Sequence, residues 1–138
     1  DYLFYTTHAA DPLPAAVGHK VVEIVIRDRL AERARELGDY LETQLRDLQQ
    51  RHPVIGDVRG RGLLLGVELV TDRQSKVPAN DIGGAVGQRC LELGACLNIG
   101  RRSMSSVFRI APPLTVGRAE IDRAMAIFDQ ALSECAPG

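Results

Sequence analysis

The sequence has few cysteines and no long apolar run, and both shortages narrow the class of protein. Its 138 residues include three cysteines, Cys90, Cys96 and Cys135, without a CxxC pair. This number and spacing argue against a disulfide framework and a zinc site, and they favour a reducing cytoplasm. No apolar run approaches the roughly 18 residues of a membrane span, and residues 1–7 lack the basic start of a signal peptide. We therefore expect a cytoplasmic protein with no membrane partner.

An excess of charge of either sign is also missing. Seventeen Lys and Arg residues oppose 18 Asp and Glu residues, for a formal net charge of -1. This balance creates no field that would attract nucleic acid or an anionic membrane, so we expect neither as a partner. Hydrophobic residues make up 45% and charged residues 25%, close to average globular usage. The length suits one modest domain, or part of one.

Four amphipathic helices are predicted from apolar residues at intervals of three and four. The first starts at Asp11, which can cap it, and Pro12 fits the first helical position. The second runs from Leu30 to Leu48 and stops before a proline, the third is capped by Asp81, and the fourth is capped by Thr115. The expected buried face of the last helix consists of Ile121, Ala124, Met125, Phe128, Ala131 and Leu132.

The strands are predicted between these helices. Residues 54–70 combine glycines with apolar residues spaced by twos, which indicates a turn and one or two strands. Residues 71–80 are a polar loop, 95–99 a short strand, and 107–110 a strand that Pro112 and Pro113 terminate. This order favours an antiparallel or mixed sheet covered by helices on one face, in the α/β or α+β class. Residues 2–5 resemble a strand already in progress, so we expect the chain to begin within a larger fold.

Arg109 is a charged residue within an otherwise apolar strand. Its side chain must either point to solvent or be paired, because an isolated buried charge is costly. If it faces a cleft, its planar guanidinium suits a carboxylate held by two hydrogen bonds. The residues alone leave both interpretations open.

Two other segments have a functional and an ordinary interpretation. Thr6, Thr7 and His8 precede the first helix, so they could face an anion at its N-terminus, or they could be capping and strand residues. The glycines of residues 60–66 resemble a dinucleotide-binding fingerprint, but that motif needs a helix after it, and here a strand is predicted. We expect these glycines to form a tight turn.

Metal-dependent and hydrolytic sites have little support. The three histidines, His8, His19 and His52, share no ligand spacing. Ser105 and Ser106 lack a nearby histidine and acid in a hydrolase pattern.

Three segments together resemble the class III aminotransferases, which use pyridoxal phosphate: THAADPLPAA at 7–16, GDVRGRGL at 56–63 and FRIAPPLT at 108–115. They span almost the whole chain and, within the family, look most like dialkylglycine decarboxylase. The resemblance implies the C-terminal small domain of a fold-type I transferase over residues 29–138. Residues 1–28 would be the end of the large cofactor-binding domain and a connecting helix.

The resemblance also implies roles for individual residues. The residue matching Thr7 binds the cofactor phosphate of the neighbouring subunit, so a homodimer or a dimer of dimers is expected. The residue matching Arg109 binds the substrate α-carboxylate. In dialkylglycine decarboxylase, the segment that matches residues 7–11 binds an alkali cation. The resemblance therefore implies that potassium or sodium, which prefer oxygen ligands, is bound here by Thr7, the carbonyl of Ala9 and the carboxylate of Asp11.

The sequence has only two lysines, Lys20 and Lys76, and neither matches the family's Schiff-base lysine. In the family this lysine lies upstream, so the chain alone is expected to be inactive. The intact protein is expected to transfer an amino group from an amino acid to a keto acid, with or without decarboxylation of a dialkylglycine and with pyruvate as an acceptor. The alternative is a truncated, non-catalytic fragment or interaction module. The loop at 100–106 leads into the Arg109 strand and is a candidate for side-chain specificity.

Overall fold

The computed structural model of the protein describes residues 7, 11–99 and 106–136. Its elements are α1 (Pro12–Arg27), α2 (Leu30–Arg51), β1 (Ile55–Arg61), β2 (Leu64–Leu69), α3 (Asn80–Glu92), β3 (Asn98–Ile99), β4 (Val107–Ile110) and α4 (Arg118–Cys135). Contacts divide the chain into two compact units, Asp1–Arg33 and Ala34–Gly138, which are described separately below. The domain boundary expected between residues 28 and 29 stays a prediction.

The first helix begins as its sequence indicates. Asp11 is the N-cap of α1, its Oδ1 atom accepts from the Leu13 backbone N–H at 3.3 Å, and a proline occupies the first turn. None of the residues of α1 is buried. Its large exposed hydrophobic residues are Leu13, Val17, Val21, Val22 and Ile26. Within the described part of the first unit, the apolar stripe of α1 is therefore not buried.

The second unit contains a four-stranded antiparallel sheet in the order β1-β2-β4-β3. β1 and β2 form a hairpin in which Arg61 pairs with Leu64, and Gly62 in the two-residue connection has a φ of 55°. This left-handed backbone favours glycine, so the predicted tight turn is confirmed at Gly62, whereas Gly60 and Gly66 lie within β1 and β2. β3 is shorter than the strand expected over 95–99.

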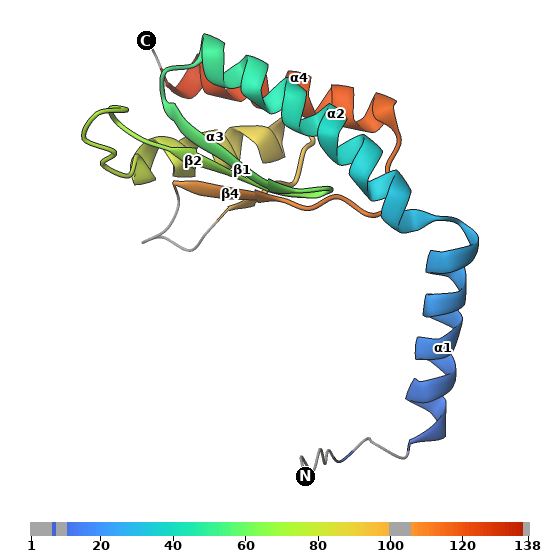
Figure 1. The fold of residues 1–138 in the computed structure, drawn as a ribbon. Coiled ribbons are helices and arrows are strands. Elements are labelled where there is room, and N and C mark those ends of the chain that lie inside the picture. Colours follow the sequence, from blue (N-terminus) through green and yellow to red (C-terminus); the bar gives the residue numbers. More distant parts are fainter. Residues whose placement is uncertain (1–6, 8–10, 100–105, 137–138) are drawn as a thin grey trace. The chain divides into compact units, whose positions relative to one another are not determined.

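Helices cover one face of this sheet. Figure 1 shows α2, α3 and α4 on the same side of the strands. Phe108 of β4 and Phe128 of α4 are fully buried between the two layers, with ring centroids 5.2 Å apart in an edge-to-face arrangement. The rest of this core includes Leu41, Leu45, Leu48, Leu65, Val67, Leu69, Val86, Cys90, Ile121, Met125, Ala131 and Leu132. The predicted helix-covered sheet is confirmed, whereas Ala124 of the expected buried face is only half-buried.

Two helix caps differ from the sequence prediction. α3 begins one residue before Asp81, with Ala79 as its N-cap, because the Ala79 N–H donates to the Leu69 carbonyl at 3.0 Å and ties the chain to β2 at that point. The predicted cap of α4 at Thr115 is also wrong, since the N-cap is Gly117. A turn closed by the Val116 N–H and the Pro113 carbonyl includes Thr115.

Glu120 compensates for the missing cap side chain of α4. Its carboxylate accepts a hydrogen bond from the Gly117 backbone N–H at 2.5 Å. This is the return half of a capping box, which satisfies a backbone donor at the helix start. The start of α4 therefore depends on a residue inside the helix and not on a side chain before it.

Candidate functional site

The face of the sheet opposite the helices carries a row of residues from three strands. Arg59 of β1 pairs with Gly66 of β2, and Gly66 pairs with Arg109 of β4. Residues directly opposite each other in an antiparallel pair point to the same face. Their neighbours Val58, Val67 and Phe108 are buried toward the helices. We call the face of the sheet opposite the helices, which carries Arg59, Gly66 and Arg109, the open face.

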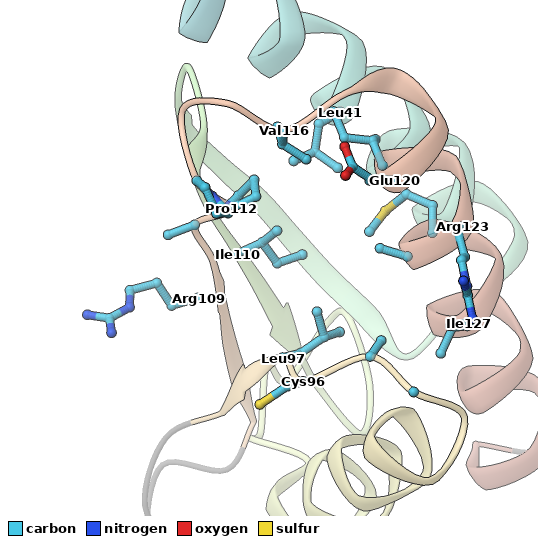
Figure 2. A pocket seen from close by; sticks show the side chains of 17 residues that line it. Leu41, Cys96, Leu97, Arg109, Ile110, Pro112, Val116, Glu120, Arg123 and Ile127 are labelled. Carbon is cyan, nitrogen blue, oxygen red and sulfur yellow. The ribbon is translucent and has the colours of Figure 1, made fainter. Parts of the chain in front are cut away.

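The side chain of Arg109 is exposed on the open face. Figure 2 shows it pointing away from Leu41, Ile110 and Val116, which lie between β4 and α4. Among the residues that the structure describes, none forms a hydrogen bond or ion pair with its guanidinium. Directly opposite on β2 is Gly66, which has no side chain, and on the other side Arg109 pairs with Asn98 of β3. Of the two interpretations of Arg109, the described residues show the exposed one.

Arg59 is in a different state on the same face. Its Nη1 atom donates to Asp57 Oδ2 at 2.6 Å and to Glu68 Oε2 at 2.9 Å. The hydrogen bonds that Arg59 donates to these two carboxylates, above all the one to Asp57, raise the pKa of Arg59 above its usual value. The open face therefore carries one arginine engaged by two acids and one arginine without a partner among the described residues.

A separate cavity of about 550 Å³ lies on the helix side of β4. Figure 2 shows its apolar lining from Leu41, Leu97, Ile110, Val116 and Ile127. Arg109 belongs to the lining, but its side chain points away from this space. The guanidinium of Arg109 therefore lies on the open face and not in the cavity.

The other candidate residues belong to the first unit. Thr7 is exposed in a turn, and the carboxylate of Asp11 caps α1. Ala9, the third expected cation ligand, lies outside the described residues. Within the described residues, no group of three or more His, Cys, Asp or Glu side chains could hold a metal ion. The alkali-cation set of Thr7, Ala9 and Asp11, with its hydroxyl and carbonyl ligands, is a different kind of site and stays a prediction.

Both lysines, Lys20 and Lys76, have exposed side chains. The Nζ atom of Lys20 pairs with Glu23 at 2.9 Å on the exposed surface of α1. Lys76 is exposed in the loop between β2 and α3, with a φ of 56°.

The described helices include none that is both long and apolar enough to cross a bilayer.

Sequence reasoning missed the cluster of Asp57, Arg59 and Glu68. The alternation of Asp57 and Arg59 along one strand was a usable signal, since residues two apart share a face. What the sequence could not supply is the pairing of Asp57 with Glu68, which depends on the register of β1 against β2.

Comparisons with known proteins place the chain among aminotransferases. The family model described as Aminotransferase class-III matches residues 4–132. An uncharacterized aminotransferase of Schizosaccharomyces pombe is 49% identical over 133 residues, which are 96% of this chain and 30% of that protein. The mitochondrial alanine–glyoxylate aminotransferase 2 homolog 2 of Arabidopsis thaliana is 35% identical over 131 residues, 95% of this chain and 27% of that protein.

Solved structures show the same likeness. A Bacillus anthracis aminotransferase superposes with a TM-score of 0.87 at 31% identity, over 96% of this chain and 30% of that one. A PLP-bound amine transaminase from an uncultivated Pseudomonas species has a TM-score of 0.86 at 26% identity, over 97% of this chain and 30% of that one. The chain thus spans about 30% of the length of these proteins.

Proposed function

The chain belongs to the class III aminotransferase family, and from this premise we propose that the intact protein binds pyridoxal phosphate and transfers an amino group from an amino acid to a keto acid. The family match over residues 4–132 and the likeness to transaminases support this proposal. Because the chain spans about 30% of its relatives, it would contribute one part of the site. Pyridoxal phosphate, when bound, supplies the electron sink for chemistry at the α-carbon.

The observation that carries the proposal is the state of Arg109. Its guanidinium is exposed on the open face, opposite a glycine, and has no partner among the described residues. A guanidinium presents two parallel N–H donors that match the two oxygens of a carboxylate. We infer that Arg109 binds the α-carboxylate of the amino-acid substrate and so orients the bonds at its α-carbon.

The residues of the first unit fit a supporting role at the cofactor. Thr7 is exposed just before α1, and its hydroxyl could donate to a phosphate oxygen beside a helix N-terminus. We propose that it does so for the cofactor of the neighbouring subunit, in a homodimer or a dimer of dimers. Lys20 is paired with Glu23, and Lys76 is in a loop, so the proposal assigns the cofactor lysine to a part of the protein outside this chain.

The finer assignments of the resemblance remain part of the proposal. The first is that the intact protein decarboxylates a dialkylglycine and uses pyruvate as the amino acceptor. The second is that Thr7, the Ala9 carbonyl and Asp11 bind potassium or sodium. In support of the second, the Asp11 carboxylate stands at the start of α1, and carboxylate oxygens are ligands that hard cations prefer. Cytoplasmic localisation is likewise proposed from cysteine usage, although one of the similar relatives is named as mitochondrial.

The experiment that tests the carboxylate role is Arg109→Ala in the intact protein. We expect KM for an amino-acid donor to rise roughly 100-fold, because a charge-assisted bidentate contact is lost. KM for an amine donor without a carboxylate should stay unchanged. The absorbance spectrum of the bound cofactor serves as the control for an intact site. Equal affinity of the variant and the parent for the amino acid would refute the role of Arg109.

A further inference from the structure

A carboxylate of this chain lies within reach of Arg109. Gly66 pairs with Arg109 and Glu68 with Val107, so Glu68 is the diagonal cross-strand neighbour of Arg109 on the open face. Diagonal neighbours in an antiparallel pair are roughly 7–8 Å apart, which long side chains can span. Glu68 is therefore placed to compete with a substrate carboxylate for the guanidinium.

The same register puts a second arginine on the other side of Glu68. Arg59 pairs with Gly66 and Asp57 pairs with Glu68, so Arg59 is the diagonal neighbour of Glu68 from β1. Glu68 thus lies between two arginines on the open face, one on each flanking strand. In the structure it is bonded to Arg59, at 2.9 Å from its Nη1 atom.

The charges of the cluster explain why Arg59 is needed. Asp57 and Glu68 are directly opposite each other, and like charges in this position are destabilising. Arg59 contacts both carboxylates through one nitrogen and offsets half of their charge. Arg61, the other arginine of β1, is opposite Leu64 and is not a diagonal neighbour of Glu68. Without Arg59, the nearest cation to Glu68 in this register, among the described residues, would be Arg109.

We propose that Arg59 is a positioning residue which keeps Glu68 bonded on the β1 side of the sheet and thereby leaves Arg109 free to bind the substrate carboxylate. The inference rests on the proposed function, because it needs Arg109 to be the carboxylate-binding group. Its consequence is specific to substrates with a carboxylate. Loss of Arg59 allows Glu68 to pair with Arg109, and this pair must break before such a substrate can bind.

The test is Arg59→Gln in the intact, cofactor-loaded protein. We expect KM for an amino-acid donor to rise about two- to fivefold, the factor that an exposed ion pair can supply, with kcat unchanged. An amine donor without a carboxylate should keep its KM. Calorimetric binding of propionate, a carboxylate that cannot react, should weaken by a similar factor, which makes the test independent of activity.

Two further variants separate positioning from a general structural effect. Arg61→Gln removes the same charge from the same strand without a contact to Glu68, so it should leave both donors unaffected. Glu68→Gln combined with Arg59→Gln removes the competing carboxylate, so KM for the amino acid should return to the parent value. Failure of this rescue, or an equal loss for amine and amino-acid donors in Arg59→Gln, overturns the positioning role.

The outcome for Arg109 keeps this inference distinct from the proposed function. If Arg109→Ala leaves amino-acid binding unchanged, the carboxylate role of Arg109 fails and the inference fails with it. If Arg109→Ala weakens binding while Arg59→Gln does not, the carboxylate role stands and only the positioning role of Arg59 is refuted.

Discussion

Gly38 of α2 and Gly62 of the β1–β2 hairpin are in backbone contact: a Cβ atom added at Gly38 would overlap the carbonyl carbon of Gly62. Gly62 itself faces the Ala34 carbonyl of α2, at 3.2 Å from the position of an added Cβ atom. Because both partners are backbone, neither can move aside as a flexible side chain would. This contact seats α2 on the hairpin that also carries Arg59 and Gly66.

Gly38→Ala should therefore destabilise the protein by about 1–3 kcal/mol, as overpacking does, despite the higher helix propensity of alanine. The control is Gly84→Ala in α3, where an added Cβ atom meets nothing within 4 Å. This control should be neutral or stabilise by up to about 1 kcal/mol. Urea denaturation of the two variants measures both effects, and a neutral Gly38→Ala would contradict the close packing.

Phe128→Ala should cost about 3–5 kcal/mol of unfolding free energy. Phe128 is fully buried and stacks edge to face on Phe108, so its loss leaves a cavity between α4 and the sheet. Phe128→Leu keeps most of the volume and should cost clearly less. Thermal unfolding compares the two variants. A similar loss of stability in both would mean that the cavity is not the main cause of the destabilisation.

Asp129→Asn should change how stability depends on pH. Burial of Asp129 opposes ionisation, but hydrogen bonds from His52 and Arg51, each at 2.6 Å, outweigh it and hold the pKa of Asp129 below its usual value. A carboxylate with a lowered folded-state pKa stabilises the protein above the unfolded value near 3.9, and this contribution is lost as pH falls through the folded value.

At neutral pH, Asp129→Asn should cost about 1–2 kcal/mol, and the difference from the parent should shrink below about pH 4. Asp39→Asn, an exposed change on α2, should stay within about 0.5 kcal/mol of the parent near neutral pH. Chemical denaturation at several pH values measures the difference. If the difference in unfolding free energy between the parent and Asp129→Asn grew as the pH fell, the pH dependence expected from the lowered pKa of Asp129 would be wrong.

The cysteines should differ strongly in reactivity. Burial raises the pKa of Cys90 to about 11, whereas the side chain of Cys96 is exposed. The thiolate is the reactive form, so iodoacetamide at pH 8 should modify Cys96 while Cys90 stays unmodified until the protein unfolds. Peptide mass spectrometry over a time course follows both sites. Modification of Cys90 at the rate of Cys96 under native conditions would contradict the packing of α3 against the sheet.

The helices and strands could be predicted well because their signals are local. Asp11 and Pro12 mark the start of α1, and the spacing of leucines marks α2. In both cases the residues that give the signal are only a few positions apart in the sequence. The caps at Asp81 and Thr115 could not be predicted in this way. There, long-range or turn hydrogen bonds decide where the helix begins, and the side-chain type alone does not.

The candidate site shows the same division. The sequence by itself determined that Arg109 lies on a short strand that prolines end, and its motifs indicated the family that the comparisons confirm. Only the tertiary structure decided that Arg109 is opposite Gly66, is diagonal to Glu68, and shares the open face with Arg59. The physical reason is that the pairing of β2 with β4 is set by hydrogen bonds and core packing between residues about 40 positions apart, and no local pattern records it.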